Sequence, residues 1–334
     1  MCAEVFFSVW AVIFYEGEVR KMELVWNVVL LLVGFVLLLK GADYFVDGAV
    51  GIAERFHIPQ IVIGLTIVAF GTSAPEAAIS IVAGMKGSAD LSVGNILGSN
   101  IMNILLILGL TACIRPLKVQ KNTVRYEMPF LIGVSVLLAA MGYLEQKLTL
   151  SSGLILWGVF LCFFGYLIAQ SKKGKDEAEE ENGEKKSVWL ILLMTVGGLA
   201  AIVIGSQLTV DNASAIAKAL GMSERLIGLT IVAFGTSLPE LITSVTAARK
   251  GSADIAIGNI IGSNIFNILF VLGTTSLITV VPYQRAFLLD GIIGIAAAAF
   301  LLITTAKGKM LRRWAGAVML IGYAGYFVHL LLTA

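Results

Sequence analysis

A six-residue polar motif occurs twice in this chain, each time inside a strongly hydrophobic stretch. The first copy, Gly-Thr-Ser-Ala-Pro-Glu, ends at Glu76, and the second, Gly-Thr-Ser-Leu-Pro-Glu, ends at Glu240, 164 residues later. Residues 64–104 and 228–268 align without a gap and are identical at 28 of 41 positions. Because a carboxylate inside a membrane span is costly, the two glutamates are expected to mark a functional site.

Each motif also offers neutral oxygen ligands beside its carboxylate. Thr72 and Glu76 are four residues apart and share one face of a helix. Pro75 lacks an N–H and crowds the carbonyl of Gly71, so we expect a local break that frees the carbonyls from Ala69 to Gly71. Carboxylate, hydroxyl and carbonyl oxygens are the ligands that Na⁺ and Ca²⁺ prefer, which predicts a cation site.

A second polar run follows each motif. Its members are four residues apart on one helical face: Asn95, Ser99 and Asn103 in the first copy, and Asn259, Ser263 and Asn267 in the second. Small polar residues in membrane helices often serve only kinks and packing, and we assign that role to Asn100 and Asn264. Packing does not explain two glutamates that have no Lys or Arg nearby to pair with them.

The elements that position these residues are transmembrane helices. The chain is 58% hydrophobic and 14% charged, far more apolar than a soluble domain. Apolar stretches of about 18 residues or more recur along it, each long enough to cross a bilayer. The sequence predicts an all-α polytopic membrane protein with ten spans, at residues 24–46, 58–85, 91–112, 126–144, 151–170, 188–214, 222–249, 254–276, 285–304 and 312–332.

Both glutamates are expected near the middle of the membrane. Lys86 marks the aqueous end of its span, and Glu76 lies ten residues before it. Ten helical residues cover about 15 Å, which is half of the hydrocarbon thickness of about 30 Å. Lys250 and Glu240 repeat the same spacing, so the two carboxylates approach the centre from opposite sides.

The duplication divides the chain into two five-helix repeats, residues 22–170 and 188–334. Because five is odd, the second repeat enters the membrane from the opposite side, which makes the repeats inverted. The charged run 171–187 is expected to be a solvated linker. Residues 1–21 form an N-terminal extension of unclear role, and Met22 would be a natural start.

Basic residues predict the orientation. Excluding Lys40, connections that follow odd-numbered spans carry 16 Lys and Arg residues, against seven elsewhere. The positive-inside rule then places the 171–187 linker in the cytoplasm and both termini outside the cell membrane. The three cysteines fall at unrelated positions, so neither a disulfide framework nor a thiolate metal site is expected.

The paired Gly-Thr-Ser-x-Pro-Glu motifs and the Gly-Asn-Ile-x-Gly-Ser-Asn-Ile-x-Asn-Ile runs resemble the cation/calcium exchanger superfamily, in particular its sodium/calcium exchanger branch. The resemblance implies the ten-helix inverted-repeat fold. It also implies cation ligands at Thr72, Ser73, Glu76, Ser99, Asn103, Thr236, Ser237, Glu240, Ser263 and Asn267, with carbonyl ligands at Ala69 and Ala233. Potassium-dependent members have an aspartate where this chain has Asn267. The glutamate typical of calcium/proton exchangers is absent, because Leu97-Gly98 stands in its place.

The resulting hypothesis is a monomeric antiporter that exchanges Na⁺ for Ca²⁺ by alternating access, exports Ca²⁺ and uses no cofactor. The alternative is calcium/proton exchange, because a desolvated glutamate at the midplane could carry protons. A passive cation channel is disfavoured by the inverted repeats and by the lack of a filter sequence. A membrane enzyme is disfavoured because the two histidines, His57 and His329, lie near span ends.

Overall fold

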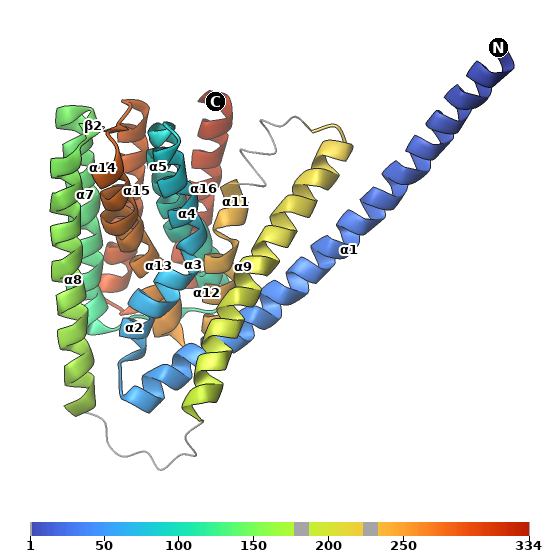
Figure 1. Ribbon diagram of the computed structural model, residues 1–334. Helices are drawn as coiled ribbons and strands as arrows, with labels where there is room; N and C mark the ends of the chain where they lie inside the picture. Colours follow the sequence, from blue (N-terminus) through green and yellow to red (C-terminus); the bar gives the residue numbers. More distant parts are fainter. Residues whose placement is uncertain (1, 177–186, 223–232, 334) are drawn as a thin grey trace.

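The computed structural model describes residues 2–176, 187–222 and 233–333 and is a bundle of helices (Figure 1). The helices are α1 (Cys2–Phe56), α2 (Gln60–Ile63), α3 (Ala69–Thr72), α4 (Ala74–Met85), α5 (Ala89–Met102), α6 (Gly109–Ile114), α7 (Met128–Glu145), α8 (Leu150–Asp176), α9 (Val188–Ala219), α11 (Ala233–Thr236), α12 (Leu238–Lys250), α13 (Ala253–Phe266), α14 (Gly273–Ile278), α15 (Ala286–Ala306) and α16 (Arg313–Thr333). Short π-helical segments are η1 (Gly64–Val68), η2 (Asn103–Leu108), η3 (Thr123–Glu127) and η5 (Asn267–Leu272). The strands are β1 (Leu117–Lys118), β2 (Lys147–Leu148), β3 (Val281–Pro282) and β4 (Met310–Leu311).

Among the described residues, eight helical stretches are long and apolar enough to cross a membrane, or nine when the bent pair Gln60–Thr72 and Ala74–Met85 counts as one span. Nine of the ten expected spans correspond to these stretches. The remaining one, 222–249, lies partly outside the described residues, and only its later portion is seen, as α11 and α12. The described residues therefore contain eight or nine candidate spans, whereas the sequence predicted ten.

Two helices are longer than the sequence suggested. The first span was expected at 24–46, but α1 runs from Cys2 to Phe56, so the expected N-terminal extension is helical and continuous with the span. Helix α8 continues to Asp176, into the segment expected to be linker. Apolar periodicity ends where a helix leaves the hydrocarbon, whereas backbone hydrogen bonding can continue beyond it, which explains both differences.

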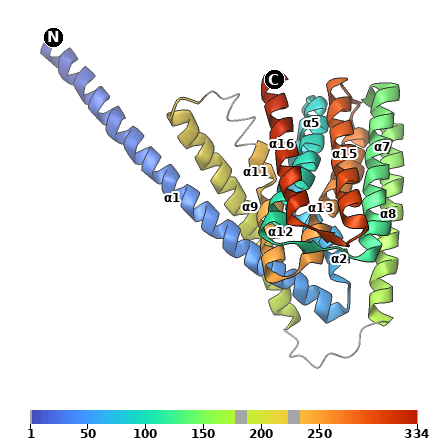
Figure 2. The same ribbon diagram turned by 180° about the vertical axis from the view of Figure 1, so that it is seen from behind.

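Helices α1 and α9 pack as a close antiparallel unit, the α1/α9 pair, at one side of the bundle (Figures 1 and 2). Glycines permit this approach: a Cβ on Gly41 would lie 2.9 Å from the carbonyl oxygen of Gly198, and one on Gly205 would lie 2.8 Å from that of Gly34. Small residues at helix crossings are typical of membrane proteins. The α1/α9 pair therefore behaves as one packing element.

The central helices are α5 and α13, which are covered on most sides by the rest of the bundle. Antiparallel pairs of short strands join the surrounding loops: β1 pairs with β4, and β2 pairs with β3. Because β1 precedes α7 and β2 follows it, the two pairs lie at opposite ends of a helix about 27 Å long. The strands thus mark the two ends of the bundle.

Hydrogen bonds place the ends of the two motif-bearing helices. Just beyond α4, Asp90 accepts a hydrogen bond of 3.2 Å from Gln284, which follows β3. Just beyond α12, Asp254 accepts one of 2.6 Å from Gln120, which follows β1. Helices α4 and α12 therefore run towards opposite ends of the bundle, as the spacing of Lys86 and Lys250 predicted.

Candidate functional site

Each motif interrupts its helix at the serine. Helix α3 ends at Thr72 and α4 begins at Ala74, with a bend of 52° between the two parts of the span. In the second copy, α11 ends at Thr236 and α12 begins at Leu238, and Ser237 (φ −92°, ψ 5°) has nearly the backbone angles of Ser73 (φ −83°, ψ 6°). The prolines occupy the first turns of α4 and α12, where the fixed φ angle of proline suits the start of a helix.

The expectation that the Ala69 carbonyl is freed by this break is wrong. Its oxygen accepts the N–H of Ser73 at 3.0 Å and hydroxyl groups of Thr72 and Ser263, each at 3.4 Å. Proline removes the donor of only one carbonyl, the one four residues earlier. That carbonyl belongs to Gly71 in the first copy and to Gly235 in the second.

The Gly235 carbonyl receives a replacement donor from outside the motif. The hydroxyl of Ser206 on α9 donates a hydrogen bond of 2.9 Å to it. The matching residue of the first repeat, 164 positions earlier, is Ala42, which has no hydroxyl. Ser206 was not identified from the sequence, and the only available signal was this difference between the repeats.

We expect Ser206→Ala to lower the stability of the protein. The Gly235 carbonyl would lose its side-chain donor in the membrane interior, and an unsatisfied buried polar group costs about 1–3 kcal/mol. Thermal unfolding in detergent, compared with Ser206→Thr, which retains the hydroxyl, measures the loss. Equal stability of the alanine variant and the parent protein would contradict this role.

The two motif glutamates are buried, with 1% of Glu76 and none of Glu240 exposed. Each accepts a hydrogen bond from the motif serine of the other repeat: Ser73 donates to Glu240 at 2.8 Å, and Ser237 donates to Glu76 at 3.3 Å. Ser99 on α5 lies 3.5 Å from the Glu76 carboxylate. The site is therefore formed at the contact of the two repeats and belongs to both.

A second layer of cross-repeat contacts orients two side-chain amides. The Asn103 amide donates to the side-chain oxygen of Asn264 at 2.9 Å, and the Asn267 amide donates to that of Asn100 at 3.2 Å. Asn100 and Asn264 also donate to each other's backbone carbonyl groups, at 3.3 and 3.0 Å. Asn100 and Asn264 thus hold the amides of Asn103 and Asn267 in place, which agrees with the packing role predicted for them.

Four buried oxygens of the expected ligands have no hydrogen-bond partner among the described residues. They are one carboxylate oxygen of Glu76, one of Glu240, and the side-chain carbonyl oxygens of Asn103 and Asn267. All four are acceptors, and they come in matching pairs from the two repeats. Unsatisfied buried acceptors are rare in folded proteins, and a cation is one group that would satisfy them.

The remaining expected ligands lie around these acceptors or on the same helices. Thr72 donates to the side-chain oxygen of Asn259 at 2.9 Å, and Ser263 lies beside the Ala69 carbonyl. Thr236 precedes Ser237 at the second break, and Ala233 begins α11. Within the described ranges no three His, Cys, Asp or Glu side chains form a cluster, so the region offers two carboxylates supplemented by neutral oxygens.

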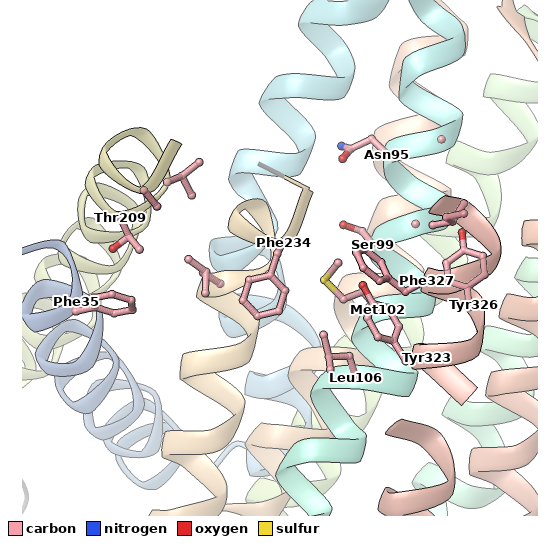
Figure 3. Close-up of a pocket in the computed structure, with 16 residues that line it drawn as sticks. Phe35, Asn95, Ser99, Met102, Leu106, Thr209, Phe234, Tyr323, Tyr326 and Phe327 are labelled. Atoms are coloured by element: carbon pink, nitrogen blue, oxygen red, sulfur yellow. The ribbon is translucent and has the colours of Figure 1, made fainter. Parts of the chain in front are cut away.

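A cavity of about 550 Å³ lies beside the site, and no feature of the sequence predicted it. Figure 3 shows Asn95 and Ser99 of α5 on one wall, with aromatic side chains of α16 beside Ser99, Thr209 of α9 across from them, and Phe234 between the two sides. Most of its lining is apolar, including Phe234 and Tyr323. Through Ser99, which contacts Glu76, the cavity connects with the buried carboxylates.

The profile of a family described as "Sodium/calcium exchanger protein" matches residues 26–169 and 190–332, nearly the whole of both repeats. The chain belongs to the sodium/calcium exchanger family. Its relatives in this family include a putative antiporter, CaxA, of Alkalimonas amylolytica, which is 42% identical over 89% of this chain and 96% of its own. Another is the sodium/calcium exchanger MaX1 of Methanosarcina acetivorans, 33% identical over 91% of this chain and 98% of its own.

Solved structures of the exchanger family have the same fold. The sodium-calcium exchanger NCX_Mj, in a structure soaked without Na⁺ and Ca²⁺, superposes with a TM-score of 0.81 at 34% identity. The match covers 92% of this chain and 99% of that one. The same exchanger soaked with 10 mM Na⁺ gives a TM-score of 0.80 at 35% identity.

Proposed function

We propose that this exchanger is a secondary antiporter that uses inward movement of Na⁺ to export Ca²⁺ through the site at the contact of the repeats. The observation that carries the proposal is the set of four buried, unpartnered oxygens on Glu76, Glu240, Asn103 and Asn267. Two carboxylates balance the charge of one Ca²⁺, and hydroxyl, amide and carbonyl oxygens complete the six to eight ligands that it takes. The names of its relatives, an antiporter and a sodium/calcium exchanger, support the same assignment.

The proposed ligands are the twelve residues that the resemblance to sodium/calcium exchangers implies. Glu76 and Glu240 bind Ca²⁺ directly and also contact Na⁺, with the motif threonines and serines, Ser99, Ser263 and the two asparagines around them. The Ala69 and Ala233 carbonyls complete the sodium sites. The Ala69 oxygen accepts hydroxyl donors that can rotate away, which leaves it available to a cation.

The proposed architecture is ten helices in two inverted repeats, with residues 171–187 as a cytoplasmic linker and both termini outside. The antiparallel packing of the α1/α9 pair and the opposite directions of α4 and α12 support the inversion. Basic residues support the orientation. In this arrangement the cavity beside Ser99 is an aqueous route from the outer side, and the transport unit is a single chain.

We expect Na⁺-driven calcium uptake into inside-out vesicles or proteoliposomes to proceed when potassium is replaced by choline. Asn267 brings an amide oxygen and no charge, so the site lacks a third carboxylate to balance a potassium ion. The measurement is ⁴⁵Ca²⁺ uptake under an imposed Na⁺ gradient, with and without K⁺. Strict dependence on potassium would show that this role of Asn267 is wrong.

The same uptake measurement under an imposed proton gradient distinguishes sodium/calcium exchange from the alternative, calcium/proton exchange. The carboxylates of Glu76 and Glu240 have no Lys or Arg partner among the described residues, so protons could also neutralise them. Uptake driven by a pH gradient without Na⁺, and not by a Na⁺ gradient at constant pH, would replace the sodium assignment with the proton one. Absence of uptake under both gradients would reject antiport of calcium altogether.

A further inference from the structure

An ion pair fastens one end of the α1/α9 pair to the bundle. The amine of Lys250, the last residue of α12, lies 2.6 Å from the Asp47 carboxylate on α1. It also donates a hydrogen bond of 2.8 Å to the Asp43 carbonyl and lies 3.5 Å from the Asp43 carboxylate. Helix α1 packs along α12 in the same region.

The internal duplication supplies a second copy of this ion pair. Subtracting 164 from Lys250 gives Lys86, at the end of α4, and adding 164 to Asp47 gives Asp211 on α9. Both aspartates follow a valine, and the glycines of the α1/α9 pair keep the same offset, Gly34 with Gly198 and Gly41 with Gly205. The matching aspartate and lysine are therefore present at equivalent positions of both repeats.

Only one of the two copies is formed in the described structure. Among residues 2–176, 187–222 and 233–333, neither Lys86 nor Asp211 makes an ion pair or hydrogen bond through its side chain. The C-terminal end of α9 diverges from α4 and α5 in both views (Figures 1 and 2). The cavity lined by Asn95 on α5 and by Thr209 and Ala213 on α9 occupies the intervening space.

The glycine contacts pack α1 closely against α9, which couples the positions of the two helices. In the described structure α1 packs against α12, and the C-terminal end of α9 lies apart from α4. A tilt of the α1/α9 pair would bring α9 to α4 and remove the cavity. Lys250–Asp47 and Lys86–Asp211 thus belong to different positions of one unit.

We infer that these two ion pairs alternate: Lys250–Asp47 stabilises the arrangement with the cavity beside Ser99 open, and Lys86–Asp211 stabilises the arrangement of opposite access. The inference rests on the proposed alternating-access function. All four residues are positioning residues, since none contacts the proposed cation site. Exposed ion pairs are individually weak, so each biases the equilibrium between the arrangements by about two- to fivefold.

Thiol labelling measures this equilibrium. Cys2, Cys113 and Cys162 are replaced by alanine, and Ala213→Cys places one thiol on the cavity wall of α9. The rate of modification by a membrane-impermeant maleimide then reports the fraction of protein with the cavity open. Lys250→Gln should slow labelling about two- to fivefold, and Lys86→Gln should accelerate it by a similar factor.

Two controls separate the inference from general effects of charge removal. Glu54→Gln removes an exposed charge from α1 that makes no ion pair in the described structure, and it should leave the rate unchanged. Exchanging the partners, Asp47→Lys with Lys250→Asp, should restore the rate of the parent. Shifts of Lys250→Gln and Lys86→Gln in the same direction, no shift in either, or no restoration by the exchange would overturn the inference.

The labelling rate can be measured without calcium transport. The inference of alternating ion pairs and the proposed antiport function can therefore be rejected independently. A protein that exchanges calcium but shows unchanged labelling in both variants rejects the alternating ion pairs and leaves antiport standing. A protein that transports no calcium rejects the proposed function, whatever the labelling rates are.

Discussion

Glu76→Gln and Glu240→Gln are each expected to lower Ca²⁺ transport by at least about 100-fold while the protein remains folded. Either change leaves a dication in the membrane interior with a single carboxylate. Breaking one partner of a buried charge pair costs about 3–5 kcal/mol, and every 1.4 kcal/mol is about tenfold in affinity. The measurements are initial rates of ⁴⁵Ca²⁺ uptake in proteoliposomes and ⁴⁵Ca²⁺ binding in detergent.

The matched control is Glu127→Gln, which alters another fully buried carboxylate. The Glu127 carboxylate accepts hydrogen bonds from Tyr166 at 2.5 Å and Gln170 at 3.2 Å, and none from the motif residues. A glutamine there keeps an oxygen that can accept the Tyr166 hydroxyl, so calcium transport should persist. Near-normal transport by either motif variant would remove the central claim.

Gly262→Ala is expected to prevent correct packing of the bundle, whereas Gly98→Ala, at the equivalent position of the other repeat, is tolerated. A Cβ on Gly262 would lie 2.7 Å from the Ala69 Cβ and 2.8 Å from the Leu65 backbone. A Cβ on Gly98 would have nothing within 4 Å. Overpacking a rigid core typically costs about 1–3 kcal/mol, and here neither the Ala69 Cβ nor the Leu65 backbone atoms can rotate away.

Thermal unfolding of the two variants in detergent, monitored by size-exclusion chromatography, provides the comparison. Both changes add one methyl group to equivalent glycines of the two repeats. A general effect of alanine on helix propensity would therefore appear in both variants. A lower unfolding temperature for Gly262→Ala alone supports the packing difference. An equal decrease in unfolding temperature for the two variants would show that the surroundings of Gly98 on α5 and of Gly262 on α13 are equally crowded.

The sequence predicted the parts of the site that depend on local chemistry. Pro75 and Pro239 predicted breaks in their helices because proline lacks an N–H, and both breaks are present. The motif also predicted a buried carboxylate, and the Glu76 side chain is buried, while its depth in the membrane stays a prediction. These features follow from residues within about three helical turns of each other.

Hydrogen-bond partners that lie on other helices could not be predicted. The hydrogen bonds of Ser73 to Glu240 and of Ser206 to the Gly235 carbonyl join residues from different helices, so they depend on how those helices pack. The error at Ala69 has a local cause: Pro75 removes the donor of the Gly71 carbonyl only, so the Ala69 carbonyl keeps its helical donor, the N–H of Ser73. Likewise, hydrophobicity marks where a helix lies in the bilayer but not where its backbone pattern ends, so the lengths of α1 and α8 were underestimated.

The four unpartnered oxygens also govern how tightly the two ion fluxes are linked. Two ionised carboxylates enclosed away from water without a counter-ion cost several kcal/mol each. For the proposed antiporter, passage through the enclosed intermediate is therefore rare when the site is empty and frequent when cations neutralise it. The acceptors proposed to bind the cations would therefore also suppress return of the unloaded protein, and with it transport of one ion without the other.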